Sequence, residues 1–354
     1  MNISEVLVRW YANHKRDLPW RETKDPYKIW LSEVILQQTR VNQGIDYYYR
    51  FIEQYPTVGD LARASLDEVL KSWQGLGYYT RARNLHKTAC HIYYELGGKF
   101  PGHYEGLLKL PGIGPYTASA IASFCYSEMV AVVDGNVGRV LARVKGISTP
   151  VNSSRGKKEF QREAGRLIPS DDPATHNQAM IEFGALQCTP VQPDCFACPL
   201  KDICHAWQDD QVDVLPVKSP KRKKRLRYFY YLDIHLNGSL FLHKRNSRDI
   251  WNSLYQFPLI ESQGELPIHK LADTRAWQDL FAGLHPQIQA ISPIYSHVLT
   301  HQKIMARFIR VHITQINAPL EEGYRQINPK QLQNLAVPRL IDRYLEQENY
   351  PKNG

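Results

Sequence analysis

Four cysteines near the middle of the chain have the spacing that most plainly suggests chemistry. Cys188, Cys195, Cys198 and Cys204 follow the pattern C-x6-C-x2-C-x5-C, with prolines between them that favour loop conformations. Four thiolates in one short loop can converge on a single metal centre. Structural zinc usually takes two C-x2-C pairs, whereas a cubane cluster tolerates uneven spacing. The pattern therefore favours a 4Fe-4S cluster over zinc, and either one over four free thiols.

A turn rich in glycine and proline, Leu110-Pro111-Gly112-Ile113-Gly114-Pro115-Tyr116-Thr117-Ala118, precedes small apolar residues in helical rhythm. Glycine leaves backbone amides without side-chain cover, and here those amides lie at the start of a helix. Gly112 and Gly114 can therefore hydrogen-bond a phosphate. The alternative is an ordinary corner between two helices, which uses the same residue types.

Two carboxylates have neighbours that favour opposite charge states. Glu33 lies in the apolar run 29–36, whose side chains disfavour the ionised form and keep this acid protonated near neutral pH. A carboxylate on a solvated helix face is the weaker alternative for Glu33. Asp134 follows Ala131-Val132-Val133 and precedes a helical pattern, so free amides can keep it ionised. Taken alone, its position favours a helix N-cap, although one residue can serve both roles.

Length and composition limit the class of protein. The chain has 354 residues, enough for two domains, and a net charge of +9 that makes a polyanionic partner plausible. An evenly basic surface is the alternative. No run approaches the roughly eighteen apolar residues of a membrane span, and Glu5 and Arg9 stand where a signal peptide needs an apolar core. We expect a cytoplasmic protein, in which Cys90 and Cys125 belong to the core.

The chemistry-bearing residues are spread over a long helical region. Residues 1–212 carry apolar residues at three-to-four spacing, divided by Pro, Gly and Asp, and are predicted to be almost entirely helical. The expected helices are 3–13, 27–39, 41–55, 66–73, 80–96, 116–124, 137–144, 157–168 and 173–187.

The composition then changes twice. Residues 213–227 form a basic linker, whose positive charges either lie against phosphates or are simply solvated. Residues 228–350 are predicted to form an α+β domain, with Asn237-Gly238 as a hairpin turn. The expected strands are 228–236, 239–243, 256–260 and 305–313, and the expected helical segments are 268–284 and 329–347.

Together, the hairpin LPGIGPYTA, the stretch VDGNV and the cysteine loop resemble the helix-hairpin-helix DNA glycosylases of the endonuclease III superfamily. The segment Trp30 to Val41, with Gly75-Leu76-Gly77-Tyr78-Tyr79, is similar to the MutY-type adenine DNA glycosylases. The resemblance is close over residues 5–205. It implies a mainly α glycosylase fold with a 4Fe-4S cluster, and removal of adenine mispaired with 8-oxoguanine, and also with guanine, in duplex DNA.

Breaking the bond from a sugar to adenine needs a proton donor for the base and a negative charge for the oxocarbenium-like sugar. The resemblance assigns these roles to Glu33 and Asp134 and places Asn136 in the same site. In bifunctional relatives the position of Tyr116 carries a lysine that attacks the sugar. Tyrosine cannot form a Schiff base, so we expect a monofunctional enzyme.

The resemblance also implies residues that handle the flipped base and the DNA. Gln38 and Tyr78 would fill or wedge the helix, and Gly112 and Gly114 would hold the DNA backbone. The adenine pocket would be lined by Trp20, Arg21, Leu36, Val41 and Glu182. For the apolar and aromatic members, plain core packing is the alternative.

The C-terminal stretches 240–245 and 251–258 look like the MutT-like, Nudix-fold domain of MutY-type enzymes, but the catalytic Nudix box is absent. We therefore expect this domain to bind rather than hydrolyse. In the family a Phe-Ser-His motif reads 8-oxoguanine. The candidates here are Tyr295-Ser296-His297 and the preferred Leu299-Thr300-His301, and both depart from that motif; a β-turn without a ligand is the alternative.

Three other functions fit parts of the sequence. A glycosylase for thymine opposite guanine would share the helical domain, but the Nudix-like domain argues against it. A non-catalytic damage-binding protein would need neither Glu33 nor Asp134, and an iron-sulfur redox protein would need no hairpin. The leading prediction is a monomeric adenine glycosylase that acts on double-stranded DNA and has no membrane partner.

Overall fold

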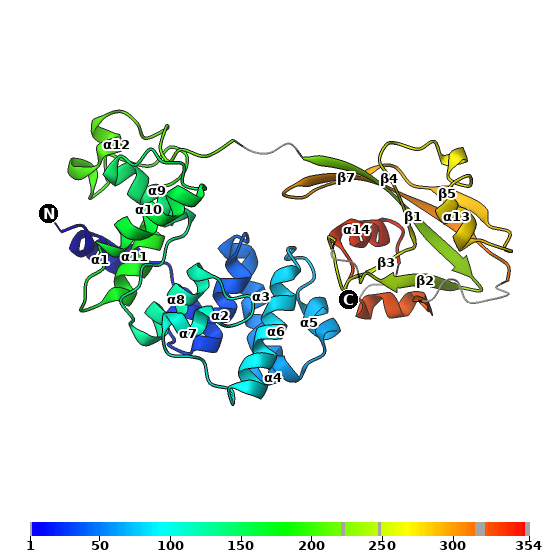
Figure 1. Cartoon of the computed structure of the whole chain (residues 1–354), viewed down its shortest axis with the longest axis horizontal. Coiled ribbons are helices and arrows are strands. Elements are labelled where there is room, and N and C mark those ends of the chain that lie inside the picture. Colours follow the sequence, from blue (N-terminus) through cyan, green and yellow to red (C-terminus); the bar gives the residue numbers. More distant parts are fainter. Residues whose placement is uncertain (1, 221–223, 247–248, 316–322, 351–354) are drawn as a thin grey trace. The chain divides into compact units, whose positions relative to one another are not determined.

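The computed structural model describes residues 2–220, 224–246, 249–315 and 323–350. Their contacts group them into two compact units (Figure 1). The first unit is Met1–Arg63 with Asn84–Lys221, and the second is Ala64–Arg83 with Arg222–Gly354. The domain boundaries expected from the sequence remain a prediction, and the compact units differ from them by placing residues 64–83 with the C-terminal part.

The N-terminal two thirds of the chain are helical, as predicted, and contain two single 3-10 turns. The elements are α1 (Ile3–His14), η1 (Pro19–Arg21), α2 (Pro26–Leu36), α3 (Val41–Gln54), α4 (Val58–Arg63), α5 (Leu66–Ser72), α6 (Thr80–Glu95), α7 (Tyr104–Leu108), α8 (Pro115–Tyr126), α9 (Gly135–Lys145), α10 (Ser154–Gly165), α11 (Pro173–Leu186), η2 (Lys201–Ile203) and α12 (His205–Gln208). Each helix in the described part of the chain is too short or too polar to span a lipid bilayer.

Local capping explains where the helices that carry candidate site residues begin. Asp25 accepts a hydrogen bond from the backbone of Tyr27, and Pro26 fills the first position of α2. Helix α8 begins at Pro115 with Gly114 as its N-cap, so the hairpin glycines directly precede this helix. Asp134 caps α9 and Asp172 caps α11.

Among the described residues of the first unit, buried clusters fix these helices in place. One is built from α1, α9, α10 and α11 around Val140, Phe160 and Phe183. Another joins α2 to α8 through Ile29, Ala120 and similar residues, and Cys125 packs against it as expected. Because most of α8 is buried, its N-terminal turn is held in a fixed place beside α2.

The second unit contains a mixed sheet in the strand order β3-β2-β1-β7-β5; β4 also pairs with β1, β6 with β7, and β8 with β2. The parallel pair β1 and β7 runs in register from Arg225 opposite Gln302 to His235 opposite His312. The elements are β1 (Arg225–Leu236), β2 (Ser239–Lys244), β3 (Tyr255–Gln256), β4 (Leu259–Ser262), η3 (Ile268–Lys270), α13 (Arg275–Leu280), β5 (Gln287–Ile291), β6 (Tyr295–Val298), β7 (Gln302–His312), β8 (Tyr324–Ile327), η4 (Pro329–Asn334) and α14 (Arg339–Gln347).

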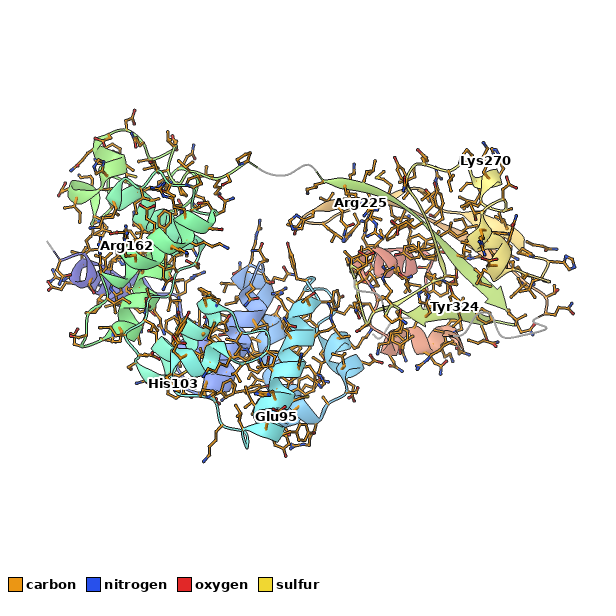
Figure 2. All side chains as sticks on the ribbon, viewed as in Figure 1. Glu95, His103, Arg162, Arg225, Lys270 and Tyr324 are labelled. Carbon is orange, nitrogen blue, oxygen red and sulfur yellow. The ribbon has the colours of Figure 1, made fainter. Side chains whose placement is uncertain are left out.

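Helices cover both faces of this sheet (Figure 1). Phe229 and Tyr231 of β1 point to the face covered by α14, where Tyr344 stacks on Phe308. Tyr230 and the other alternate residues of β1 point to the face covered by α13. Long basic side chains such as Arg162 and Lys270 lie exposed outside these cores (Figure 2).

Candidate active site

Helix α2 holds Glu33 at the edge of the first unit's core. Its neighbours Trp30 and Val34 are buried, whereas Glu33 is only partly buried. Burial raises the pKa of Glu33 to about 7; a hydrogen bond from Tyr116 works against this rise, and the charge of Asp134 adds to it. Glu33 therefore carries a proton in a large fraction of molecules near neutral pH, as its apolar neighbours predicted.

Tyr116, in the first turn of α8, donates its hydroxyl hydrogen bond to Glu33. Burial raises the pKa of Tyr116 well above its usual value, and the charges of Glu33 and Asp134 raise it further. The phenol therefore stays neutral and remains a donor. A second contact ties α2 to this turn, because Gln37 Nε2 donates to Thr117 Oγ1 at 3.3 Å.

Asp134 is the N-cap of α9 and also lies within electrostatic reach of Glu33 and Tyr116. Its Oδ1 accepts hydrogen bonds from the backbone amides of Asn136 and Val137, both at 2.8 Å. Its Oδ2 accepts one from Asn136 Nδ2 at 2.8 Å. Burial raises the pKa of Asp134, and these three bonds oppose the rise. The capping and site interpretations of Asp134 are thus compatible.

Arg139 holds Asn136 in place and was not found by sequence reasoning. Its Nη2 donates to Asn136 Oδ1 at 2.9 Å and to the Gly184 carbonyl at 2.5 Å, and its Nε donates to the Cys188 carbonyl at 2.7 Å. The sequence signal available was an arginine one turn after Asn136, but its carbonyl partners, Gly184 on α11 and Cys188 just after it, are distant in sequence.

Glu182 lies on α11 with no exposed side-chain surface and forms ion pairs with two arginines. Arg16 donates from its backbone N, Nε and Nη2 at 2.6–2.9 Å, and Arg21 donates from Nη1 and Nη2 at 2.9 and 2.6 Å. Burial alone would raise the pKa of Glu182, but these bonds lower it to about 2. Glu182 is therefore an ionised anchor beneath Arg21, whose charge also reaches Glu33. Arg16 was missed by sequence reasoning.

The other residues predicted for the adenine pocket differ in exposure. Trp20 is buried and packs edge-on against Tyr48, with 5.2 Å between the ring centres, an arrangement compatible with core packing. Leu36 and Val41 are partly buried at the facing ends of α2 and α3. Between them, Gln38 is exposed and has a left-handed backbone with φ of 61°.

The two hairpin glycines differ in whether their backbone requires glycine. Gly112 has φ of 76°, and a Cβ there would lie 2.6 Å from the Cβ of Asn84, so no other residue fits without a shift. Gly114 has ordinary φ, and a Cβ there would meet nothing within 4 Å. Both glycines are exposed, which leaves their backbone open to an approaching group.

The four loop cysteines are partly buried free thiols. Burial raises the pKa of Cys198 to about 11, and the neighbouring cysteines add to the rise. Arg143, which is buried, donates to Cys188 Sγ at 3.4 Å and to the Thr189 carbonyl at 2.7 Å. Within the described residues, no three His, Cys, Asp or Glu side chains form a finished metal-binding group. The charges of the loop cysteines nevertheless act on one another's thiols, and Arg143 lies beside Cys188, a set of donors that suits one anionic centre with sulfur ligands.

The two candidate recognition motifs lie in different surroundings in the second unit. Tyr295 is buried in β6 against Phe308, so the first motif begins in the core. Leu299, Thr300 and His301 form the turn between β6 and β7, where Thr300 and His301 are exposed. Thr300 Oγ1 lies 3.4 Å from the hydroxyl of Tyr78, which belongs to the same unit.

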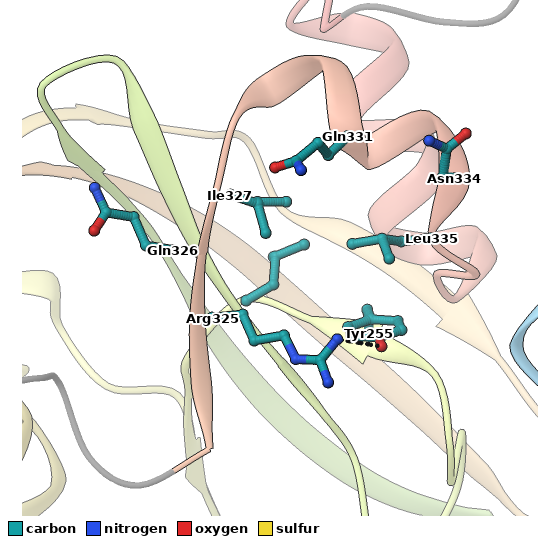
Figure 3. Close-up of a pocket in the computed structure, with 8 residues that line it drawn as sticks. Tyr255, Arg325, Gln326, Ile327, Gln331, Asn334 and Leu335 are labelled. Carbon is teal, nitrogen blue, oxygen red and sulfur yellow. Dashed lines mark hydrogen bonds between the residues drawn. The ribbon is translucent and has the colours of Figure 1, made fainter.

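A pocket of about 460 Å³ lies apart from this turn, beside β2, β3, β8 and η4 (Figure 3). Its apolar lining includes Leu242, Ile327 and Leu335. Two of its polar groups pair with each other, because Arg325 Nη1 donates to Tyr255 Oη at 3.3 Å. No residue predicted to read a lesion lines this pocket.

Known proteins match both units. Residues 31–170 match the HhH-GPD superfamily of base excision DNA repair proteins, and residues 230–347 match the NUDIX domain family. An adenine DNA glycosylase of Buchnera aphidicola subsp. Acyrthosiphon pisum is 31% identical, with 99% of this chain and 98% of that protein covered. The rat adenine DNA glycosylase is 46% identical over 57% of this chain and 41% of its own length.

Solved structures show the same helical fold. A thermostable thymine-DNA glycosylase has a TM-score of 0.54 and 28% identity, covering 58% of this chain and 95% of its own. A trapped covalent intermediate of endonuclease III with DNA has a TM-score of 0.51 and 24% identity, covering 58% of this chain and 94% of its own. At that identity the second likeness concerns the fold alone.

Proposed function

The chain belongs to the adenine DNA glycosylase family, and from this premise we propose that it removes adenine mispaired with 8-oxoguanine, and also with guanine, from double-stranded DNA. It is a DNA glycosylase of base excision repair, and its reaction is hydrolysis of the N-glycosidic bond. The observation that carries the proposal is the group formed by Glu33, Tyr116 and Asp134, in which one acid keeps its proton near neutral pH.

Glu33 acts as the general acid. With a pKa of about 7 it can give its proton to the departing adenine, so that the base leaves neutral. Its partner Tyr116 donates a hydrogen bond to Glu33, which fixes the orientation of the acid. Arg21, anchored by Glu182, adds a positive charge at the edge of the same site.

Asp134 stabilises the positive charge that develops on the sugar. The first turn of α9 directs two backbone amides and the Asn136 side chain at this carboxylate, which favours its ionised form despite burial. Asn136 is a positioning residue, itself held by Arg139. Water completes the hydrolysis, because Tyr116 offers no amine for a Schiff base.

DNA is held and read by exposed turns. The open backbone at Gly112 and Gly114, directly before α8, suits a phosphate. Gln38 and Tyr78 have exposed, left-handed backbones at turns, as expected of residues that enter the duplex. We assign 8-oxoguanine recognition to Leu299, Thr300 and His301, which the proximity of Thr300 to Tyr78 supports.

Cys188, Cys195, Cys198 and Cys204 hold a 4Fe-4S cluster in this proposal. When bound, such a cluster cross-links the loop through its sulfur ligands. Arg143 compensates the negative charge of the thiolates and ties the loop to α9. If the cluster is bound, the purified protein should show an absorption band near 400 nm. If the band is absent and the protein contains zinc, the four cysteines form a zinc site instead.

We further propose that the protein acts as a monomer in the cytoplasm.

One experiment tests the substrate. The protein is incubated with duplexes that hold adenine opposite 8-oxoguanine, adenine opposite guanine, or thymine opposite guanine, and abasic sites are then cleaved with alkali. We expect release from the first two duplexes only. Release of thymine alone would favour the activity named for one structural relative. No adenine release from the first duplex would refute the proposal.

The monofunctional mechanism needs its own test. Borohydride trapping with the adenine:8-oxoguanine duplex should give little covalent adduct, and strands should stay intact without alkali. A glycosylase with a lysine in the hairpin is the positive control. Trapping as efficient as in that control would contradict the role given to Tyr116.

A further inference from the structure

The turn that joins α5 to α6 has an unusual backbone. In Gly75-Leu76-Gly77-Tyr78, here called the GLGY turn, φ is 101° at Gly75, 70° at Gly77 and 48° at Tyr78. Glycine adopts such angles freely, but a bulky aromatic residue does so only when its surroundings impose them. Something in the fold must therefore hold Tyr78 in this conformation.

The two consecutive tyrosines of this segment are used in opposite ways. Tyr78 is exposed, with 53% of its surface accessible to solvent, whereas Tyr79 is buried, with 6% accessible. The hydroxyl of Tyr79 donates to the Val337 carbonyl at 3.3 Å, within the same unit. The turn thus anchors one ring and displays the other.

Arg81 supplies contacts that fix the displayed ring. Its Nη2 donates to the carbonyls of Leu76 and Gly77 at 3.2 and 3.3 Å, and its backbone N donates to the Tyr78 carbonyl at 2.8 Å. Its guanidinium carbon lies 5.1 Å from the centre of the Trp73 ring and 5.6 Å from that of Tyr78. Trp73 Nε1 also donates to the Gly77 carbonyl, at 3.1 Å.

This arrangement requires an arginine. The side chain is buried, yet a planar guanidinium can donate to two carbonyls at its edge while its face lies against aromatic rings. An ammonium group has no plane to stack and no fixed fork. Burial lowers the pKa of Arg81 to about 10, so the group stays positively charged at neutral pH.

We propose that Arg81 is a positioning residue that holds the ring of Tyr78 ready to enter the DNA duplex. The inference rests on the proposed function, in which Tyr78 wedges the helix while adenine leaves it. Arg81 itself lies beneath the turn and acts through Tyr78. Its loss therefore weakens the unstacking of the target base and leaves the bond-breaking groups, which belong to the first unit, intact.

A double-mutant cycle tests this coupling. Single-turnover excision from the adenine:8-oxoguanine duplex is measured for Arg81→Lys, Tyr78→Ala and the double variant, with melting curves as the folding control. We expect each single substitution to slow excision by about tenfold or more, since base stacking on one aromatic side chain is worth this much. The double variant should be no slower than Tyr78→Ala. Additive losses would overturn the proposal.

Two further variants keep the test decisive. Arg83→Lys is the matched control, because Arg83 lies on the same helix but donates to Thr80 Oγ1 and the Asn252 carbonyl, away from the GLGY turn. It should excise at the normal rate. Gly77→Ala adds a methyl group with nothing within 4 Å, so it strains only the backbone. It should slow excision as Arg81→Lys does; a normal rate would contradict the proposal.

A binding measurement separates this proposal from the proposed function. 2-Aminopurine beside the target adenine brightens when the stack opens, whether or not the base is then released. Wild-type protein should brighten it, and Arg81→Lys and Tyr78→Ala should each reduce the signal. Brightening without adenine release, reduced in Arg81→Lys, would remove the proposed activity and keep the role of Arg81. Equal brightening by wild type and Arg81→Lys would remove that role even if adenine is released.

Discussion

Two carboxylates, one partly buried in the first unit and one fully buried in the second, show how the same functional group is prepared for different work. In the first unit, burial raises the pKa of Glu33 to about 7. In the second unit, Asp233 of β1 has no exposed side-chain surface, yet its pKa is held below its usual value. Burial alone would raise both, so the difference lies in the partners.

Asp233 is surrounded by donors. Its Oδ2 accepts from the hydroxyls of Tyr344 and Tyr350 at 2.7 and 2.9 Å and from Arg310 Nε at 3.2 Å, and His235 Nε2 lies 3.1 Å from Oδ1. These contacts outweigh the burial that opposes them. The ionised carboxylate thereby fastens α14 and the residues after it to the sheet.

Glu33 has a poorer set of partners. One phenol donates to it, the charge of Asp134 repels its ionised form, and Arg21 offsets only part of this effect. An acid that must release a proton is thus buried with few donors, whereas an acid that must hold a structure is buried with many. The number and charge of the donors, rather than depth, decides the state of each group.

The largest expected effect comes from removing the proton of Glu33. Glu33→Gln should slow excision by roughly 10²–10⁴-fold, the usual contribution of a general acid. Because Gln cannot ionise, the melting temperature at pH 8 should stay the same or rise. Glu163→Gln, which changes a surface ion pair with Arg166, is the control and should keep full activity. Near-normal turnover in Glu33→Gln would remove the distinction drawn between the two carboxylates.

Asp134→Asn should have the next largest effect. Asparagine still caps a helix well, so α9 should form normally while the charge facing the sugar is lost. We expect excision to fall by roughly 10²–10³-fold, as when one electrostatic stabiliser is removed. Binding of the mispaired duplex, measured by fluorescence anisotropy, should be unchanged. Weak binding together with a low melting temperature would instead indicate a purely capping role.

Asp233→Asn tests the other side of the comparison. It removes the charge that the Tyr344 and Tyr350 hydroxyls and the partly buried Arg310 face, although Arg310 keeps Glu348 as a partner, so the second unit should lose about 2 kcal/mol of unfolding free energy. Urea unfolding followed by tryptophan fluorescence measures this loss. In folded protein, excision of adenine opposite guanine should continue. A variant as stable as wild type would show that the donors around Asp233 contribute little.

Per pH unit, the effect of pH is smaller than that of either active-site substitution, and it has opposite signs in the two units. The pKa of Glu33 is raised in the folded protein. The contribution of its protonated form to the free energy of unfolding is therefore complete below the pKa of the unfolded chain and is lost as pH rises through about 7. Single-turnover excision should fall by about tenfold per pH unit above 7. Asp233 has a lowered pKa, so its contribution to stability is present above its unfolded value and lost as pH falls through the folded one. A flat excision profile from pH 6 to 9 would contradict the assignment of Glu33.

Much of this fold could be predicted from periodicity and punctuation. The helices now seen as α2, α3, α8, α9 and α11 were expected at nearly the observed bounds, because each has an apolar face and a cap or Pro/Gly boundary. The long strands β1 and β7 were also expected. Helices α4 and α7 were missed because they are too short for a period, and β5 because all its residues are exposed. The strand expected at 256–260 is divided by Phe257-Pro258.

The acid character of Glu33 could be inferred because its cause, the apolar run around it, is local in sequence. Contacts made by Arg16, Arg81 and Arg139 could not be inferred in the same way. Arg16 meets Glu182 across 166 residues, and no local pattern encodes such a pairing. Arg81 has local partners, but only the left-handed backbone of the GLGY turn brings their carbonyls within its reach.

Gly184 lies where α11 passes the first turn of α9. A Cβ at residue 184 would lie 2.7 Å from Asn136 Cβ and 2.8 Å from its carbonyl oxygen. In terms of mutational tolerance, position 184 is therefore closed even to alanine, because Asn136 fills the space that a Cβ would need. A single methyl group at residue 184 would displace the first turn of α9, whose amides hold Asp134.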